Sequence, residues 1–439
     1  MATGDLSLKI TVSGSDYLVS DDEYVADDGN FHYGYVLDAP VMTLGATRGG
    51  YANFRSGFVV LENRPLDSTH PFGSSRYTTM VASPSTTYAF VLKTTLTGYD
   101  WITGVLVIEN ITEESLRFTM YPYEYTTSPV STVSDSDGNT VTAPWVYGAV
   151  TNFNNLVQTG STTFQNPTDL TTGLSFKEDG GVETMSSIST SSFTVATYSD
   201  GQPTLSSSTS KTLEDFFDYV ATSLSLTVTS ANTAKATGAS SLAVKIRQEQ
   251  PFPLVEIASS VAESFNHQFY IGPNTSDSNR TTLFLIDRAN NPASFVTFEE
   301  DEIVDASFKI GFPVGGISAT YKVTEIQTNK VTEYDEFVRV ENKPIGSELE
   351  VNAYADSYAD RSQVSTLLTA IKNTDIKASA SVTMPDIQTS YNLGDRFKFG
   401  REIDFVNCDM IARSITYNFQ NKTTTLSGDA NLSAYIRTF

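Results

Sequence analysis

Hydrophobic and polar residues alternate in the last part of the chain with the two-residue period of half-buried β-strands. In the run 396–400 the two phenylalanines fall on one face, and the two basic residues fall on the other. A longer alternation runs through Ile411, Arg413, Ile415, Tyr417 and Phe419. A polar link at 420–422 and a threonine-rich run at 423–428 follow it. Two β-rich runs around a short polar link predict a hairpin.

The same period recurs through the first part of the chain. Clusters of Gly, Pro, Asp and Asn separate five candidate strands. Their positions are 6–12, 57–62, 87–93, 104–110 and 117–121. Many short strands at this spacing favour a barrel or a sandwich. From 186 to 210 the chain is rich in Ser and Thr, which predicts a linker with one edge strand.

The period changes to that of an α-helix after Thr212, which is a suitable N-cap. The first apolar stripe consists of Leu213, Phe216, Phe217, Val220, Ala221 and Leu224. A second stripe with the same spacing consists of Leu254, Ile257, Ala258, Val261, Ala262 and Phe265. Strand-like runs at 268–271 and 281–287 follow it. Residues 211–298 therefore predict a small α/β unit whose two helices share one core.

Strand patterns return after the acidic run 299–302, with a third helical stripe inside 354–373. The strands are expected at 306–310, 320–327, 336–341 and 379–384. The whole pattern predicts a mainly β protein in three parts. Two antiparallel β-barrel regions, at 1–210 and 299–439, are separated by a helix-containing α/β domain at 211–298.

The charge of the chain excludes several classes of partner. The 439 residues include 51 acidic and 28 basic side chains, which give a net charge of −23. This balance argues against binding to a nucleic-acid backbone or to an anionic membrane. The sequence has no apolar run of bilayer length and no secretory signal pattern, so we expect a protein made in the cytoplasm and not inserted into a membrane.

Residues suited to catalysis or metal binding are sparse. Cys408 is the only cysteine, which rules out an internal disulfide and a cysteine zinc cluster, and we expect it to be a small buried hydrophobe. The three histidines are His32, His70 and His267, and no nucleophile motif accompanies them. We expect structural roles for all three. The sequence therefore predicts no enzyme, no catalytic residue, no cofactor and no metal site.

One acidic loop has the ligand types of a calcium site. Residues 135–139 read DSDGN, but Gly stands in the fourth place instead of the sixth, and the twelfth position lacks Glu. Asp and Asn beside Gly favour a hairpin turn, with a weak cation site as the alternative.

Several segments resemble phage tail hub (baseplate hub) proteins in their amino-acid sequence. The C-terminal region carries LGDRF at 393–397, MIARSITYNF at 410–419 and TTLSG at 424–428, which resemble the closing β-barrel of these hubs. Upstream, FYI at 269–271 and LFLID at 283–287 are similar to the small α/β domain that the hubs carry between their barrels. The order of the parts is similar over nearly the whole chain.

The resemblance implies a structural, non-enzymatic protein of the virion tail tip, assembled in the host bacterial cytoplasm. Such a hub is a homotrimer whose two barrels per subunit imitate the sixfold tail tube. It joins the tail tube or a distal tail protein to a spike or fibre protein, and DNA passes through its ring without sequence-specific binding. The alternatives are a distal tail adaptor, a carbohydrate-binding adhesin with a groove of exposed Tyr or Trp, and a wall-degrading enzyme with a carboxylate pair in a cleft.

The acidic excess is unevenly distributed. Residues 385–439 hold six acids and six bases, whereas residues 1–56 hold eight acids and three bases. A DNA conduit works better when its wall repels phosphates, so we predict that acidic residues line the channel of the ring. The candidates are Asp21, Asp22, Glu23, Asp27, Asp28, Glu299, Glu300, Asp301 and Glu302. The alternative is that these acids are solvated loops that keep an abundant virion protein soluble.

Overall fold

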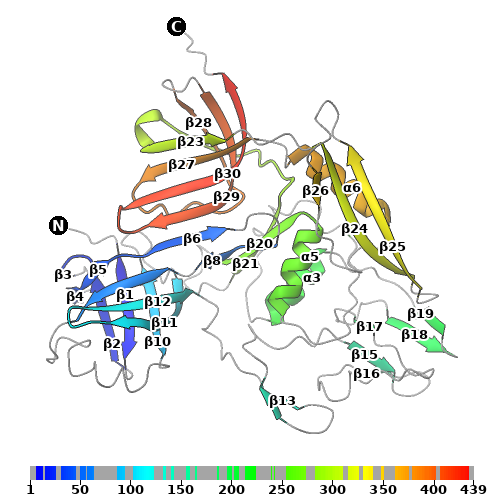
Figure 1. Ribbon diagram of the computed structural model, residues 1–439, viewed down its shortest axis with the longest axis horizontal. Helices are drawn as coiled ribbons and strands as arrows, with labels where there is room; N and C mark the ends of the chain where they lie inside the picture. The colour runs from blue at the N-terminus through cyan, green and yellow to red at the C-terminus, as the bar shows by residue number, and fades with distance from the viewer. Residues whose placement is uncertain are drawn as a thin grey trace.

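A computed structural model shows a mainly β protein with a small helix-bearing part, as the sequence predicts (Figure 1). The residues that it describes are 6–12, 15–25, 31–45, 50–55, 57–63, 87–93, 102–122, 132–134, 140–142, 155–158, 164–165, 185–186, 195–199, 202–206, 213–223, 239, 242, 254–272, 282–309, 315–325, 330–339, 348–350, 361–374, 378–401 and 406–434. Within these ranges, no helix is long and apolar enough to cross a membrane.

The N-terminal residues form a nine-stranded sheet, here called the N-terminal sheet. In pairing order its strands are β3 (Tyr24–Val25), β4 (Phe31–Gly34), β2 (Ser15–Ser20), β1 (Ser7–Val12), β10 (Thr87–Lys93), β11 (Ile102–Ile111), β12 (Ser115–Pro122), β9 (Phe58–Glu62) and β5 (Val36–Asp38). They include all five strands that the sequence predicts. Strands β4 and β5 lie near opposite ends of this order, yet only Tyr35 separates them in the chain. The sheet must therefore curl round on itself.

The C-terminal sheet has eight strands. Six follow one path in the order β22 (Val296–Phe298), β28 (Arg396–Arg401), β29 (Val406–Asn418), β30 (Thr423–Ala434), β27 (Ala378–Pro385) and β23 (Asp305–Lys309). The predicted hairpin is β29–β30. Phe308 of β23 stacks on Phe399 of β28 with ring centroids 5.9 Å apart, although β29, β30 and β27 separate these strands in the sheet. This sheet is therefore rolled as well, around a core of inward-facing aromatic and aliphatic side chains.

A strand from the N-terminal region completes the C-terminal sheet. β6 (Val41–Gly45) pairs antiparallel with residues 414–418 of β29, and β8 (Asn53–Arg55) pairs with β6. The same side of β29 pairs with β28 along its first half. One continuous hydrophobic core therefore contains buried residues of both sheets, such as Leu61 and Ile415. In Figure 1, β6 runs between the two sheets.

The helices share a second core with several strands. Its elements are β7 (Gly50–Tyr51), α3 (Leu213–Ser223), α5 (Leu254–Ser264), β20 (His267–Gly272), β21 (Thr282–Asp287), β24 (Gly316–Glu325), β25 (Lys330–Arg339), β26 (Glu348–Glu350) and α6 (Arg361–Thr374). We call this group the helix-bearing unit. The predicted stripes are confirmed, because Phe216, Phe217, Val220, Val261 and Phe265 are buried together. The side chain of Ile257 lies outside the described residues.

The third helix belongs to this second core. Val364, Leu368 and Ile371 of α6 are buried against β24 and β25, in the same cluster as α3 and α5. Residues from both sides of position 298 thus build the helix-bearing unit, because α6 needs an apolar partner and β24 offers Ile317 and Tyr321.

Short strand pairs lie between residues 132 and 206. They are β13 (Thr132–Ser134) with β14 (Thr140–Thr142), β15 (Asn155–Gln158) with β16 (Phe164–Gln165) and β17 (Met185–Ser186), and β18 (Val195–Ser199) with β19 (Gln202–Ser206). The last pair is a hairpin, whereas a linker with one edge strand was predicted for this segment. The sequence between the two strands is Asp200-Gly201, which is a signal for a two-residue hairpin loop.

Candidate functional site

A β-bulge organises the outer face of the C-terminal hairpin. The pairing of Ala412 with Gly428 is the last in register, and the register shifts at Arg413. Gly428 is required there, because a Cβ atom at this position would lie 1.8 Å from the carbonyl oxygen of Ile411. The bulge reverses the alternation, so that Ile411 and Arg413 lie on the outer face whereas Ile415 lies in the core. The unbroken alternation predicted through these residues is therefore wrong.

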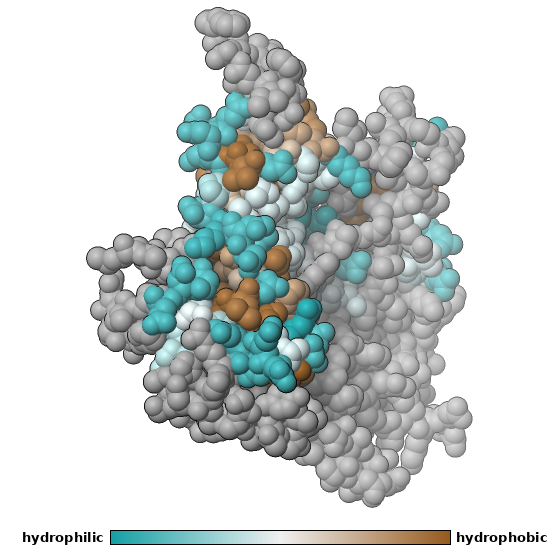
Figure 2. Space-filling view, turned by 60° about the vertical axis from the view of Figure 1, so that its left-hand side comes forward, coloured by the Kyte–Doolittle hydropathy of each residue, from teal (hydrophilic) through white to brown (hydrophobic). Residues whose placement is uncertain are grey.

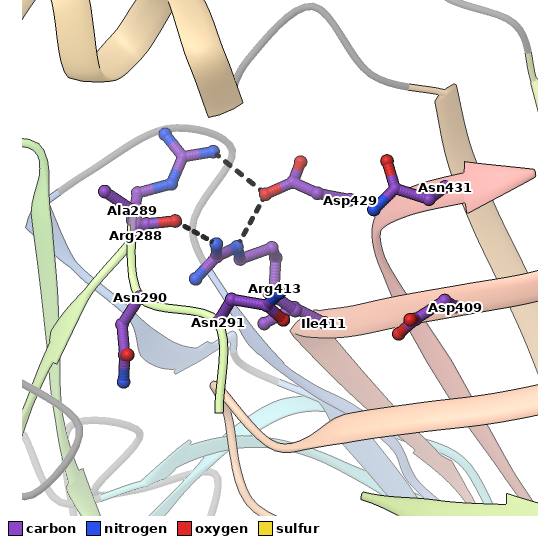
Figure 3. Close-up of a pocket in the computed structure, with 9 residues that line it drawn as sticks. All are labelled: Arg288, Ala289, Asn290, Asn291, Asp409, Ile411, Arg413, Asp429 and Asn431. Carbon is purple, nitrogen blue, oxygen red and sulfur yellow. Dashed lines mark hydrogen bonds and ion pairs between the residues drawn. The ribbon is translucent and has the colours of Figure 1, made fainter. Parts of the chain in front are cut away.

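Asp429 of β30 holds two arginine side chains at this face (Figure 3). Nε of Arg413 lies 2.7 Å from Oδ2 of Asp429, and Nη2 of Arg288 lies 3.9 Å from the same oxygen. Arg413 also donates from Nη2 to the carbonyl oxygen of Arg288, at 2.5 Å. Both arginine side chains are only 8% exposed. Charge-assisted hydrogen bonds are strong in such a region because little water screens them.

The helix-bearing unit positions Arg288. This residue directly follows β21, and its backbone N–H donates to the carbonyl oxygen of Asn266 at 3.1 Å. Asn266 adopts a positive φ of 55° at the end of α5, a conformation that Asn tolerates better than most residues. On the neighbouring strand, Nε2 of Gln268 donates to the carbonyl oxygen of Arg413 at 3.4 Å. Arg413 thus contacts the helix-bearing unit through both its side chain and its backbone.

A second arginine repeats the arrangement nearby. Arg396 of β28 forms two hydrogen bonds with the carboxylate of Asp409, at 2.7 and 2.5 Å. Its Nη1 donates to the carbonyl oxygen of Pro292 at 3.0 Å. Nζ of Lys398 lies 3.8 Å from the ring centroid of Phe295, a cation–π contact. The connecting segment 288–295 is thereby fastened to the outer face of the C-terminal sheet.

The chemistry of this junction is structural. The cavity beneath residues 288–291 has a volume of about 30 Å³, which fits roughly one water molecule. Arg413 and Arg396 each join an aspartate of the sheet to a carbonyl oxygen of the connecting segment. The junction therefore fixes the helix-bearing unit relative to the C-terminal sheet. The sequence shows that residues 385–439 carry equal numbers of acids and bases, but it does not show which of them pair.

The predicted channel acids fall in two groups. Residues 299–302 are exposed in and before the short helix η2 (Glu300–Glu302), between β22 and β23. The carboxylate of Glu302 accepts a hydrogen bond from the backbone N–H of Glu299 at 2.8 Å, which stabilises this turn.

The second group lies beside the N-terminal sheet. Asp22 and Glu23 are exposed, and Asp21 forms an ion pair with Lys422 at 3.5 Å. Lys422 belongs to the turn of the C-terminal hairpin, so this pair joins the two sheets. The remaining candidates, outside the described residues, are Asp27 and Asp28.

Two of the histidines, His267 and His32, and the cysteine Cys408 are buried within the fold. His267 is buried at the start of β20, with Nδ1 2.7 Å from the carbonyl oxygen of Phe265. Burial lowers the pKa of His267, and the nearby charge of Asp287 opposes this shift.

The side chains of His32 and Cys408 are buried as well. His32 lies within β4, and its Nδ1 is 3.4 Å from Oγ of Ser7. Burial raises the pKa of Cys408 to about 12, so its thiol stays protonated at neutral pH and is a poor nucleophile. His70 lies outside the described residues.

Within the described part of the chain, no group of three His, Cys, Asp or Glu side chains is arranged to hold a metal ion. Residues 135–139 lie outside it, but the flanking strands β13 and β14 pair antiparallel, as a hairpin requires.

Exposed apolar side chains occur in small patches among hydrophilic surface (Figure 2). Within the described ranges, the large ones are Leu37, Val41, Phe58, Phe295, Val296, Val304 and Phe337. None of these is Tyr or Trp, the residues expected to line a glycan-binding groove.

Comparison with known proteins gives a consistent class of similar structures. No family model and no curated protein matches the sequence. The prophage MuSo2 43 kDa tail protein from Shewanella oneidensis is 11% identical over 96% of this chain and 98% of its own, with a TM-score of 0.46. A tail protein from Neisseria meningitidis is 9% identical over 97% and 96%, with a TM-score of 0.43. Prophage tail protein gp18 from Listeria monocytogenes is 9% identical over 97% and 94%, with a TM-score of 0.40. Each of these three solved structures is a tail protein.

Proposed function

We propose that this protein is a structural hub of a phage tail tip. It forms a homotrimeric ring around the DNA channel and joins the tail tube or a distal tail protein to a spike or fibre protein. The observation that carries this proposal is the pairing of β6 with β29, which builds two rolled sheets into one body.

A subunit of a ring needs its two sheets and its helix-bearing unit held in fixed positions relative to one another. β6 adds five residues of strand pairing between the N-terminal region and the C-terminal sheet. A buried core then continues across both sheets, and the two arginine junctions fasten the helix-bearing unit to the C-terminal sheet. Three such subunits supply six rolled sheets, which suits a sixfold tube above them.

The exposed acids suit the wall of the channel. The side chains of residues 299–302, Asp22 and Glu23 are exposed to solvent. Neither the run 21–23 nor the run 299–302 contains a basic residue. A wall of this charge repels the phosphates of passing DNA instead of binding them.

Oligomeric mass and shape test the proposal. Light scattering of the purified full-length chain, coupled to size-exclusion chromatography, is expected to give the mass of a trimer. Electron microscopy of the same fraction is expected to show a ring with a central channel. A protein that stays monomeric at every concentration contradicts the hub, and glycan binding by that monomer supports the adhesin instead.

A further inference from the structure

Two strands of the described chain each have a partner on one side only. β23 ends the C-terminal sheet and pairs with β27, and β25 ends a three-stranded sheet and pairs with β24. β25 is ten residues long. Unpaired N–H and C=O groups along such an edge form a template for a further strand.

The exposed side chains of these strands alternate. They are Asp305, Ser307 and Lys309 on β23, and Glu333, Asp335, Phe337 and Arg339 on β25. Phe337 is 58% exposed, although its ring covers Gly316, where an added Cβ would lie 2.2 Å from it. The opposite face of β25 packs on α6. The edge of β25 therefore combines an apolar ring with charges of both signs.

The two edges are complementary in charge. When the strands run antiparallel, one register sets Asp305 opposite Arg339 and Lys309 opposite Asp335. Opposite charges directly across an antiparallel pair are stabilising. The parallel alignment of the same four residues sets acid against acid and base against base, so both pairs repel. Charge thus selects the direction and the register together.

We propose that β23 of one copy of this chain pairs antiparallel with β25 of a second copy in this register. The contact rests on the proposed hub function, since it forms the interface between neighbouring subunits of the ring. β23 lies at the upper left of Figure 1, and β25 lies at the right. A contact between two different surfaces on opposite sides of a subunit is head-to-tail, and it closes into a ring when the rotation between neighbouring subunits is a whole fraction of a turn.

Cysteine cross-linking tests the register. In the proposed pairing Ser307 lies opposite Phe337, with Cα atoms about 4.5 to 5.5 Å apart, which suits a disulfide. Full-length protein carrying Ser307→Cys and Phe337→Cys, oxidised with copper phenanthroline, is expected to run as a covalent trimer on a non-reducing gel. A mixture of the two single variants is expected to give covalent dimers. The native Cys408 is buried and remains as an unreactive background.

The matched control moves one cysteine along the same strand. Ser307→Cys with Glu333→Cys places the thiols four residues out of register, roughly 13 Å apart, and is expected to give at least tenfold less cross-linked product. Equal cross-linking of the two variants, or none by either, contradicts the proposed register.

Charge exchange tests the contact without cysteines. Asp305→Arg is expected to reduce the oligomer to monomers, and Asp305→Arg combined with Arg339→Asp is expected to restore the oligomer. A trimer that is unaffected by Asp305→Arg overturns this interface but leaves the hub standing. A wild-type protein that never forms oligomers overturns both.

Discussion

At the scale of single residues, Arg413 and Arg396 each use one guanidinium to join two parts of the chain. Arginine suits this role because its planar fork donates in several fixed directions at once, which a lysine ammonium does not. Arg413 binds Asp429 and the carbonyl oxygen of Arg288, and Arg396 binds Asp409 and the carbonyl oxygen of Pro292.

Removing the shared carboxylate is expected to weaken this junction strongly. Asp429→Ala leaves two arginine side chains, each 8% exposed, without their counter-ion. Breaking a buried ion pair on one side costs about 3 kcal/mol or more, which urea unfolding would measure. The exposed pair of Lys9 with Asp16 supplies the control, because Asp16→Ala is expected to cost less than about 1 kcal/mol. Equal losses in the two variants would show that the junction carries no special stability.

The bulge makes Gly428 a second sensitive position. Gly428→Ala sets a methyl group against the Ile411 carbonyl oxygen, so β29 and β30 must move apart. We expect a loss of about 2 to 3 kcal/mol in the free energy of unfolding. Thr425→Ala on the same strand removes a methyl group and a hydroxyl that lies 2.9 Å from Thr383 Oγ1, without forcing the strands apart, and a loss of less than about 1 kcal/mol is expected. Unchanged stability of Gly428→Ala would mean that the bulge is absent.

Protonation of His267 is expected to make the free energy of unfolding depend on pH. Its pKa in the folded state lies below the ordinary 6.5, so below that pH the unfolded chain binds a proton that the folded chain does not. Stability is therefore fully present above pH 6.5 and falls as the pH is lowered, by at most about 1.4 kcal/mol per pH unit. Unfolding curves of wild type and His267→Gln between pH 5 and 6.5 test this, and the variant is expected to have the shallower slope. Parallel slopes would assign the effect to other groups.

The residues of the junction were only partly predictable. Equal numbers of acids and bases in 385–439 indicate pairing, but the partners of Arg413 depend on the bulge. A bulge depends on backbone contact at Gly428, which leaves no periodic signal. The carbonyl of Arg288 is a backbone atom more than a hundred residues away, which no pattern of side chains reveals.

At the scale of elements, prediction succeeded where a run was long or strongly periodic. The helices α3 and α5 and the hairpin β29–β30 show clear periods of 3.6 and 2, and the structure contains all of them. β6 was missed, because it has five residues, follows Pro40 and pairs with a strand near the other end of the chain. Its place is set by tertiary pairing instead of by its own sequence.

The core of the helix-bearing unit offers a test at this scale. Val261 of α5 is fully buried among the side chains of α3 and β20. Val261→Asp buries an unpaired charge, which costs several kcal/mol, so we expect insoluble or molten protein. Circular dichroism and thermal melting would measure the loss, with the half-exposed Glu214→Asp of α3 as the control. Normal melting of Val261→Asp would place α5 at the surface.

At the scale of the whole molecule, the acidic residues are unevenly distributed between ion pairs and the exposed surface. The C-terminal residues pair their acids and bases within the subunit, as Asp409 and Asp429 show. The acidic side chains of residues 299–302 are exposed in the described structure, so they contribute negative charge to the surface of the protein. The overall charge of −23 is thus concentrated outside the C-terminal hairpin. In the proposed ring, the position of these acids decides whether they serve the channel or only solubility.

The channel is tested by reversing charge at two of these acids. Glu300→Lys with Asp301→Lys leaves the capping residues Glu299 and Glu302 in place, so the turn is expected to survive. If these positions line the lumen, the variant ring binds linear duplex DNA in a gel-shift assay, and log affinity falls with log salt by about 0.9 for each phosphate neutralised.

Threading separates the lumen from the outer surface. Covalently closed circular DNA cannot enter an assembled ring, so the Glu300→Lys, Asp301→Lys variant is expected to bind linear DNA at least tenfold more tightly than circular DNA. The control, Glu113→Lys with Glu114→Lys in the exposed turn between β11 and β12, changes the net charge by the same amount and is expected to treat both forms of DNA alike. If the first variant also binds circular and linear DNA equally, residues 299–302 lie on the outside of the ring and the acidic channel is wrong, whereas the hub itself still stands.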